Sequence, residues 1–202
     1  MSVSNEPTSK AARPLRADAQ RNRDAIISAA REVFELEGVL ASLDGIAVRA
    51  GVGNATLYRN FPTRDDLLAA VMSVNVEVSL READELLAAS GPKEALAEWL
   101  FRLAWQLRIW HDLPYCISAA QTDPNSSVQS ANGLLIEKTR QLLDAAVHAG
   151  AALATSTAED LFELATTLSW GLDRFGHDEA GARKRVAFAT ASLFTAQQNS
   201  ST

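Results

Sequence analysis

Hydrophobic positions recur along this chain with helical spacing, and polar or glycine-containing breaks separate the runs. Four apolar residues near the N-terminus share one helical face: Ile26, Ala30, Val33 and Phe34. They predict a helix over residues 18–37, which Gly38 is placed to end. No clear run alternates apolar and polar residues as a half-buried strand does. The pattern therefore predicts an all-α protein.

Further breaks divide the rest of the chain into more helices. These are expected over residues 43–50, 54–60, 63–89, 92–110, a short segment from 114, a segment ending near 150, 157–175 and 179–197. The helix over 63–89 has no internal breaker and is long enough to connect two domains. The helix over 92–110 is apolar on two faces, which is typical of a central, buried helix. Residues 1–17 carry Pro7 and Pro14 and no apolar period, so they predict a mobile basic arm.

Residues 42–64, SLDGIAVRAGVGNATLYRNFPTR, have the spacing of a helix-turn-helix. Ser42 suits the N-cap of the first helix. The small Ala47 lets two helices cross closely, and Gly51 permits the positive φ that ends the first helix. The second helix then carries polar side chains that can reach bases and phosphates in a major groove. The segment predicts a DNA-binding module over residues 18–64.

The candidate DNA contacts divide by chemistry. The base-edge candidates are Asn54, Ala55, Thr56 and Arg59. The side chains better suited to phosphates are Tyr58, Asn60 and Arg64, with Ser42 as a further donor. Arg21 and Arg23 can add backbone or minor-groove contacts. The alternative is a small three-helix module whose polar face is merely solvated.

Composition and charge are consistent with DNA binding at one end of the chain. Residues 1–64 carry nine Lys/Arg and seven Asp/Glu and residues 65–202 carry ten and eighteen, so the net charge of −6 divides into +2 and −8. The single cysteine, Cys116, excludes an internal disulfide and agrees with a reducing compartment. No apolar run suits a membrane span, and the polar N-terminus lacks a signal core, so a cytoplasmic protein is expected.

The helix-turn-helix segment also resembles a known family. Residues 20–68 resemble the DNA-binding domain of TetR-family transcriptional regulators through Ile46-Ala47-Val48-Arg49-Ala50-Gly51-Val52, Thr56-Leu57-Tyr58-Arg59-Asn60-Phe61, Arg64 and Leu67-Leu68. The resemblance implies DNA contacts at Thr56, Tyr58 and Asn60, and it places Arg64 where a phosphate-binding Lys is usual. The chain departs from the usual pattern at Gly53, Asn54, Ala55 and Asn60, which leaves the operator sequence open.

For residues 65–202 the resemblance implies a helical domain that binds a small ligand and dimerises. Residues 81–87, residues 92–96 and the helix containing Trp99 are similar to the SbtR-like subgroup. The candidate pocket residues are Trp99, Leu103, Trp110, Tyr115, Cys116, Ile117, Phe162, Trp170 and Asp173. Their apolar bias predicts a hydrophobic or amphipathic ligand. The alternative is that these aromatic residues are ordinary core.

The two C-terminal helices are predicted to form the dimer surface. The candidate contacts are Leu161, Leu164, Leu168 and Leu172 in one helix and Val186, Ala189 and Leu193 in the other. Paired across a two-fold axis, these stripes would make a four-helix bundle. The alternative is that they pack within one subunit. Dimerisation has separate support, because two half-sites about 34 Å apart give the specificity that one short helix lacks.

Catalytic chemistry finds little support in the chain. His111 and Cys116 are separated by Pro114, and no third group is placed to orient them as a nucleophile and base. No residue pair has the close spacing of metal ligands, and no glycine-rich phosphate loop occurs, so no catalytic residue, metal or cofactor is expected.

Two functional hypotheses from different classes follow. The first is a homodimeric repressor that a small, largely apolar ligand releases from operator DNA. By resemblance, the ligand would move the 63–89 helix and separate the two recognition helices. The alternative is a helical ligand-binding or protein-interaction dimer that no longer reads DNA.

Overall fold

The computed structural model describes residues 12–108 and 110–195 of this chain. Its helices are α1 (Ala12–Glu37), α2 (Leu43–Arg49), α3 (Asn54–Asn60), α4 (Arg64–Ala89), α5 (Pro92–Leu107), α6 (Leu113–Ala120), α7 (Ser127–His148), α8 (Ala158–Arg174), α9 (Glu179–Thr190) and the 3₁₀ turn η1 (Ala191–Leu193). In these ranges the only extended pairing is one isolated bridge, between Ala152 and Phe194. The predicted all-α class is confirmed. No helix in the described ranges has the length and apolar content needed to cross a bilayer.

The ends of three helices differ from the sequence prediction. Helix α1 begins at Ala12, so the arm predicted over 1–17 is wrong for residues 12–17, and residues 1–11 lie outside the described part. Pro14 falls in the first turn of α1, where a missing backbone N–H costs little. Helix α5 ends at Leu107 rather than near residue 110.

Helix α9 is also shorter than predicted, because the chain after it pairs with another loop. The backbone N–H of Leu153 donates to the carbonyl of Leu193, and that of Thr195 donates to the carbonyl of Ala151. These bonds give the C-terminal backbone partners outside a helix, so α9 ends at Thr190.

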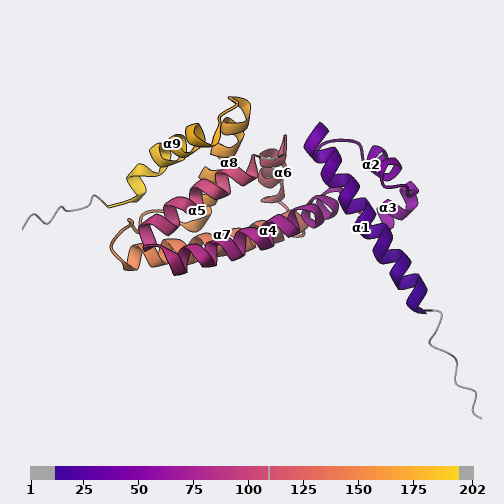
Figure 1. Cartoon of the computed structure of the whole chain (residues 1–202), viewed down its shortest axis with the longest axis horizontal. Coiled ribbons are helices and arrows are strands. Elements are labelled where there is room, and N and C mark those ends of the chain that lie inside the picture. Colours follow the sequence, from indigo (N-terminus) through magenta and orange to yellow (C-terminus); the bar gives the residue numbers. More distant parts are fainter. Residues whose placement is uncertain (1–11, 109, 196–202) are drawn as a thin grey trace, which may run out of the picture.

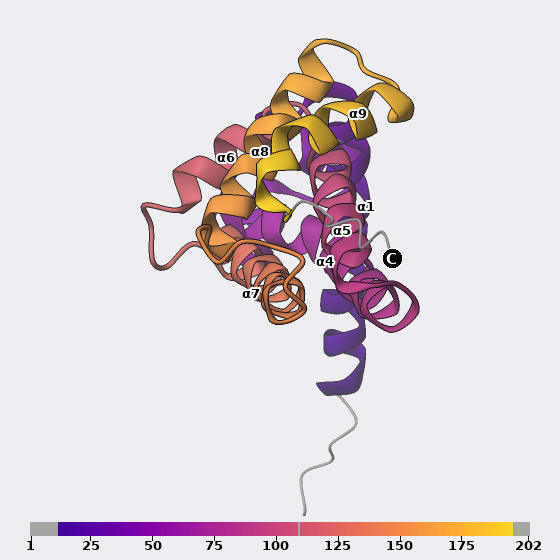
Figure 2. The ribbon, with the colours of Figure 1, turned by 90° about the vertical axis from the view of Figure 1, so that its left-hand side faces the viewer.

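The helices form two packed groups that α4 connects (Figure 1). Helices α1, α2 and α3 make a small cluster at one end of the molecule, and α4 leaves it to run alongside α7. Helix α5 packs against α4, α7, α8 and α9, which gives it the central position visible in Figure 2. Trp99 of α5 is 1% exposed, and its Nε1 donates to Thr139 Oγ1 of α7 at 2.9 Å. The prediction of a central, buried helix is confirmed.

The small N-terminal cluster has its own apolar core. Phe34 of α1, Ile46 of α2 and Leu57 of α3 are fully buried together with Phe61. Phe61 directly follows α3, and the guanidinium of Arg23 lies 4.5 Å from the centre of its ring. These contacts set the orientation of α3 against α1.

Two aspartates in the first turn of α4 join that helix to the start of α7. Thr63 and Asp66 form a capping box, with Asp66 Oδ2 accepting from the Thr63 backbone N–H at 3.1 Å. Asp65 accepts from Ser126 Oγ at 2.8 Å and from the backbone N–H of Ser127 at 2.5 Å. Ser127 Oγ also donates to Asp66 Oδ1 at 2.8 Å. A carboxylate suits the positive end of the α7 dipole, so these bonds tie the two helix starts together.

Hydrogen bonds from the Thr63 side chain, and then from Ser127, hold the pKa of Asp66 below its ordinary value of 3.8. A carboxyl group whose folded-state pKa is lowered adds stability above its unfolded-state pKa. That contribution is lost as the pH falls through the lower, folded-state value.

We therefore expect Asp66→Asn to lower the free energy of unfolding at pH 7 by about 1 kcal/mol. The difference in melting temperature from the unmodified protein should shrink as the pH falls below about 4. Thermal unfolding followed by circular dichroism between about pH 7 and about pH 3 measures this difference. The exposed Asp144→Asn is the matched control. A difference that stays constant with pH would contradict the assigned role of the ionised carboxylate.

Candidate nucleic-acid interface and ligand cavity

The turn between α2 and α3 has the geometry that residues 42–64 predict. Ser42 is the N-cap of α2, and its Oγ accepts from the backbone N–H of Gly45 at 3.4 Å. Gly51 adopts a φ of +67°, in the left-handed region that favours glycine. The N–H of Val52 then donates to the carbonyl of Ala47 at 3.0 Å. Ala47 is fully buried, in agreement with its predicted place where the two helices meet.

Helix α3 turns Leu57 inward and a polar surface outward. The exposed residues are Asn54, Ala55, Tyr58 and Arg59, and the half-buried ones are Thr56 and Asn60. Local hydrogen bonds orient these side chains. Asn54 Nδ2 donates to Asp44 Oδ1 at 2.8 Å, and Asn60 Nδ2 donates to the Thr56 carbonyl at 2.8 Å. The N-cap Gly53 offers no side-chain acceptor, as its departure from the family pattern implies.

The arginines around this surface have different surroundings. Arg21 pairs with Asp18 one turn earlier on α1. Arg59 is exposed, and among the described residues its one hydrogen-bond partner is Thr56 Oγ1, at 3.2 Å within α3. Arg59 therefore has most of its guanidinium available to an external acceptor.

Arg64 is already used by the fold itself. It is half-buried, and one guanidinium nitrogen donates to the carbonyls of Val39 at 2.8 Å and Ala41 at 2.7 Å. It therefore holds the loop between α1 and α2, a structural contact that the sequence analysis missed. The phosphate contact predicted for Arg64 stays a prediction. The remaining N–H groups of its guanidinium would have to make that contact.

The turn after α5 touches the end of α1. The Phe34 and Trp110 rings meet edge to face, with centroids 6.2 Å apart. The Val39 N–H donates to the His111 carbonyl at 3.1 Å. A side chain at Gly38, whose φ is +86°, would approach His111 Cβ to 3.1 Å. The body of the protein thus contacts the helix-turn-helix module at a point separate from α4.

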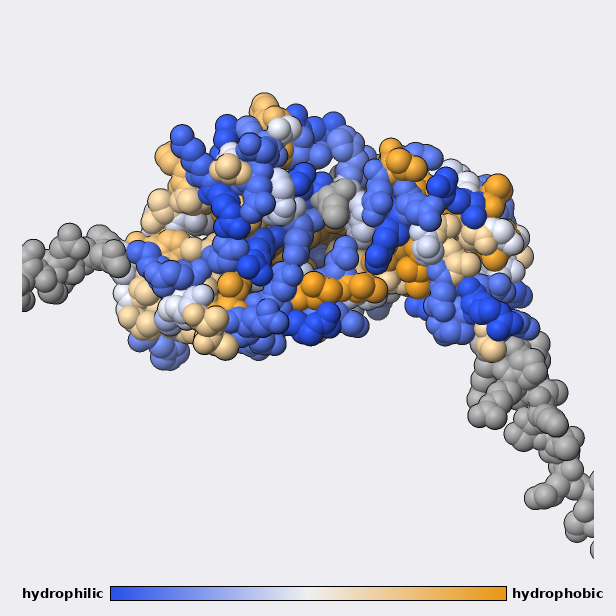
Figure 3. Space-filling model, in the orientation of Figure 1, coloured by the Kyte–Doolittle hydropathy of each residue, from blue (hydrophilic) through white to orange (hydrophobic). Residues whose placement is uncertain are grey.

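A cavity of about 210 Å³ lies between α4 and α5 and reaches Leu113 and Leu135. Its apolar lining includes Met72, Val76, Leu103, Leu107, Leu113 and Leu135. Its polar lining consists of Asn75, Ser79, Gln106 and Trp110. Val78 also lines it and is 36% exposed, and Figure 3 shows hydrophobic side chains at the surface over α4.

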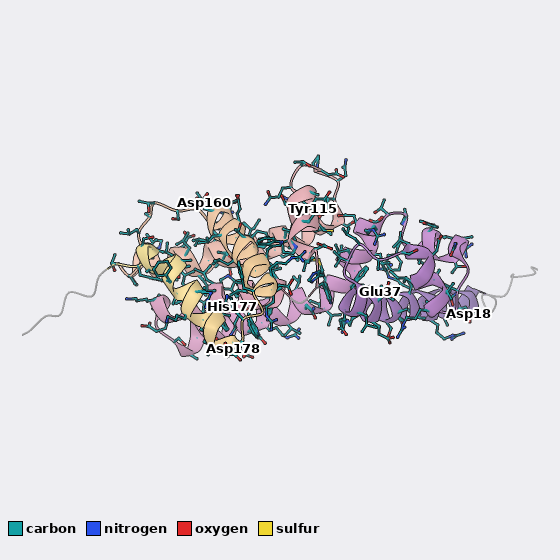
Figure 4. The ribbon with its side chains drawn as sticks, turned by 90° about the horizontal axis from the view of Figure 1, so that it is seen from above. Asp18, Glu37, Tyr115, Asp160, His177 and Asp178 are labelled. Carbon is teal, nitrogen blue, oxygen red and sulfur yellow. The ribbon has the colours of Figure 1, made fainter. Side chains whose placement is uncertain are left out.

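Only two of the predicted pocket residues, Leu103 and Trp110, line this cavity. Trp99 and Phe162 are buried elsewhere in the core, and Ile117 and Trp170 border a separate hollow beside α6 and α8. Tyr115 is 66% exposed on α6 (Figure 4).

The last two predicted pocket residues also lie elsewhere. Asp173 Oδ2 lies 3.1 Å from His111 Nδ1. Cys116 is half-buried outside the cavity lining, and burial raises the pKa of its thiol. Trp110, Trp170 and Asp173 do border one small hollow of about 10 Å³, but the structure does not bring the whole predicted set together. The cavity residues that sequence reasoning missed come mostly from α4, where Asn75 and Ser79 interrupt an apolar face one turn apart. Two polar residues on an otherwise apolar helix face are the sequence signal that could have indicated a cavity beside α4.

The predicted dimer residues divide into two groups. Leu161, Leu172, Val186 and Leu193 are between 2% and 6% exposed, so they belong to the core of the single chain and have almost no surface to offer a partner. This is a correction to their predicted role. Leu164, Leu168 and Ala189 remain half-exposed. The large exposed apolar side chains of this region are Trp170, Phe175 and Phe188.

Within the described ranges, no group of three or more His, Cys, Asp or Glu side chains is arranged to hold a metal ion.

Known protein families match both the N-terminal helix-turn-helix module and the C-terminal helical part of the chain. Residues 26–71 match the family described as bacterial regulatory proteins of the tetR family. Residues 91–192 match the C-terminal domain described as SbtR-like, of transcriptional regulators. HTH-type transcriptional regulators of Staphylococcus aureus, including that of strain USA300, are 37% identical over 65 residues. That match covers 32% of this chain and 35% of the relative, so it reaches only about a third of the relative's length.

Solved structures extend the likeness along the chain. A TetR transcriptional regulator of Streptomyces coelicolor is 31% identical with a TM-score of 0.56, over 85% of this chain and 98% of its own. A TetR regulatory protein of Mycobacterium vanbaalenii is 30% identical with a TM-score of 0.51, over 90% of this chain and 100% of its own. Thermus thermophilus FadR, a TetR-family repressor in complex with lauroyl-CoA, shares the fold at 19% identity and a TM-score of 0.58, over 88% of this chain and 98% of its own. From these matches and the helix-turn-helix geometry, the chain belongs to the TetR family of transcriptional regulators and carries an SbtR-like C-terminal domain.

Proposed function

We propose that this protein is a homodimeric repressor that binds operator DNA through α3 and is released by a small, largely apolar ligand. The observation that carries the proposal is the outward face of α3, where exposed polar groups stand on a helix held by the buried Ala47 and Leu57. A seven-residue helix is about 10 Å long, which suits the depth and width of a major groove. The regulator would act in the cytoplasm, where its DNA is.

The roles on α3 follow from exposure. Asn54 and Ala55 lie in its first turn, where they can meet base edges, and Arg59 can bond a guanine or a phosphate. Tyr58, which is 46% exposed, suits a phosphate on the groove wall. Thr56 and Asn60 are half-buried and joined by a hydrogen bond, so we assign them to positioning as well as contact.

The proposed dimer uses the outer faces of α8 and α9. Leu164, Leu168 and Ala189 would extend the apolar surface that Phe175 and Phe188 begin. Burying two such faces against each other would remove apolar surface from water, which favours association. It also presents two α3 helices, which read two half-sites.

Two contacts offer a route from the cavity to the DNA-binding module. Helix α4 lines the cavity with residues from Met72 to Ser79, and its first turn follows α3 directly. Trp110 lines the same cavity and touches Phe34 of α1. A ligand that favours one arrangement of these elements would change the spacing of the two α3 helices. It can shift the equilibrium between the two arrangements by no more than its difference in affinity for them.

We do not carry the ligand of the T. thermophilus protein over to this chain, because the two share the fold at only 19% identity. Lauroyl-CoA carries a phosphorylated head, which requires cationic partners. The described residues that line this cavity include no Lys or Arg. The apolar lining instead favours an uncharged effector.

Selection of bound duplexes from a random DNA library tests the proposal against a protein-interaction dimer. We expect a pair of related half-sites, each read by one α3. No enrichment of any sequence would favour the alternative and remove the DNA-binding proposal.

Salt dependence tests Arg59 directly. Each lost phosphate contact reduces the slope of log affinity against log salt by about one. We expect Arg59→Ala to reduce that slope by about one if Arg59 binds a phosphate, or to relax the preference for guanine at one position with the slope unchanged if it reads a base. The exposed Arg140→Ala on α7 is the control. Unchanged slope and unchanged preference would exclude Arg59 from the interface.

Arg64 should behave differently from Arg59. We expect Arg64→Ala to lower the free energy of unfolding by about 1–2 kcal/mol, because two loop carbonyls lose a charged donor in a half-buried place. Arg59→Ala should change it by less than about 0.5 kcal/mol, since exposed residues contribute little. Urea unfolding of both variants measures the difference. Equal stability of the two would show that the Arg64 contacts do not support the loop.

The dimer proposal predicts that a charge at Phe188 separates the subunits. Phe188 is 86% exposed, so Phe188→Asp should leave the fold of each chain intact. We expect light scattering after gel filtration to show a dimer for the unmodified protein and a monomer, or a much weaker dimer, for Phe188→Asp. Leu36→Asp, at an apolar position on α1 that is 74% exposed, is the control. If Phe188→Asp remains a dimer, the interface does not include the exposed face of α9 at Phe188.

A further inference from the structure

Asn54, in the first turn of the recognition helix α3, is bonded to an acidic residue of the preceding helix. Its Nδ2 donates to Oδ1 of Asp44, which lies in the first turn of α2, at 2.8 Å. Both side chains are exposed, and the buried Ala47 and Leu57 already hold the two helices. Because exposed groups contribute little to folding stability, the role of this pair is at the surface.

The bond fixes which edge of the Asn54 amide is left free. An ionised carboxylate can only accept, so the amide must turn its nitrogen toward Asp44. A flipped amide would instead place its oxygen against the carboxylate, and the two acceptors would repel each other. The amide nitrogen carries two hydrogens and one is used. The free edge of Asn54 therefore presents one N–H donor beside one oxygen acceptor.

Among the four bases, adenine complements this edge in the major groove. It presents the N7 acceptor beside the N6 amino donor, and the free N–H and Oδ1 of Asn54 can bond both together. Guanine presents two acceptors, whereas Asn54 has one free N–H to offer. Thymine O4 and the cytosine amino group each allow one bond. Fixing the amide therefore favours adenine over the other three bases.

We propose that Asp44 is a specificity-determining residue, which orients Asn54 to read an adenine in each half-site. The inference rests on the proposed function, because it names the base that one position of α3 selects. In this assignment Asp44 contacts neither base nor phosphate, so it is a positioning residue. Its negative charge beside a polyanion weakens binding to DNA of any sequence. The pair thus lowers general affinity and raises selectivity at one base pair.

Selection from a random DNA library by the full-length protein supplies the probe duplex. A parallel selection with Asn54→Ala identifies the position whose base preference depends on this amide. Affinities are then measured for four duplexes that carry each base at that position of one half-site. We expect the unmodified protein to prefer adenine by about tenfold and Asn54→Ala to show no preference. Asp44→Ala should reduce the adenine preference to about twofold and bind the other three duplexes more tightly.

A double substitution separates orientation of the amide from a general effect on the fold. In the Asn54→Ala background, Asp44→Ala should leave the base preferences unchanged, because no amide remains to be oriented. Asp44→Asn retains an acceptor oxygen and should preserve more of the adenine preference than Asp44→Ala does. The matched control is Glu35→Ala, which removes an equal charge at an exposed position of α1 and should keep the preference intact. Circular dichroism checks that each variant keeps its helices and melting temperature.

The inference is overturned if Asn54→Ala relaxes no position, if the base preferred there is not adenine, or if Asp44→Ala leaves the adenine preference unchanged. It is also overturned if Asp44→Ala relaxes a different position, since Asp44 would then contact a base itself. Each of these results keeps the proposed function, because the protein still selects a DNA sequence. Enrichment of no sequence would remove the proposed function and this inference together.

Discussion

Helix α4 is shared by the two halves of the molecule, and most other features depend on how it is held. Its first turn follows the recognition helix directly, and its later turns line the cavity. The Asp65 carboxylate fixes that first turn to the N-terminus of α7 through three donors, Ser126 Oγ and the N–H groups of Ser127 and Val128. Because charge-assisted bonds to a helix N-terminus are directional, they set both the position and the rotation of α4.

The second constraint acts through the turn after α5. Trp110 packs against Phe34, and the His111 carbonyl accepts from the Val39 N–H. Arg64 at the start of α4 donates to the Val39 and Ala41 carbonyls. The loop between α1 and α2 is therefore held from both α4 and the α5–α6 turn. Packed cores switch between discrete arrangements instead of deforming continuously. A ligand-induced change in α4 or in the α5–α6 turn can therefore reach the DNA-binding module through this loop.

The face of α3 shows how local bonds prepare a binding surface. Asn54 is held by Asp44, and Asn60 by the Thr56 carbonyl, so these side chains lose less freedom when they meet DNA. Arg59 remains exposed and keeps most of its donors. The surface of α3 thus combines the already oriented amide side chains of Asn54 and Asn60 with the exposed Arg59 side chain, which can change its conformation on binding.

The amino-acid sequence by itself determined the helices and the helix-turn-helix, because their signals are local. Ser42 and Thr63 cap helices within four residues of themselves, and Gly51 ends α2 through its own φ. Apolar spacing also identified α5 as a central helix.

Only the tertiary structure decided which side of each helix meets which neighbour. Apolar stripes on α8 and α9 looked equally suited to a core or to a partner, and packing placed Leu161 and Val186 in the core. Asp65 bonds residues about sixty positions away, and Arg64 bonds a loop that precedes it by more than twenty. The cavity likewise forms from α4 and α5 together, with its polar side determined by their relative rotation. Such contacts depend on long-range packing, which residue spacing along one chain does not encode.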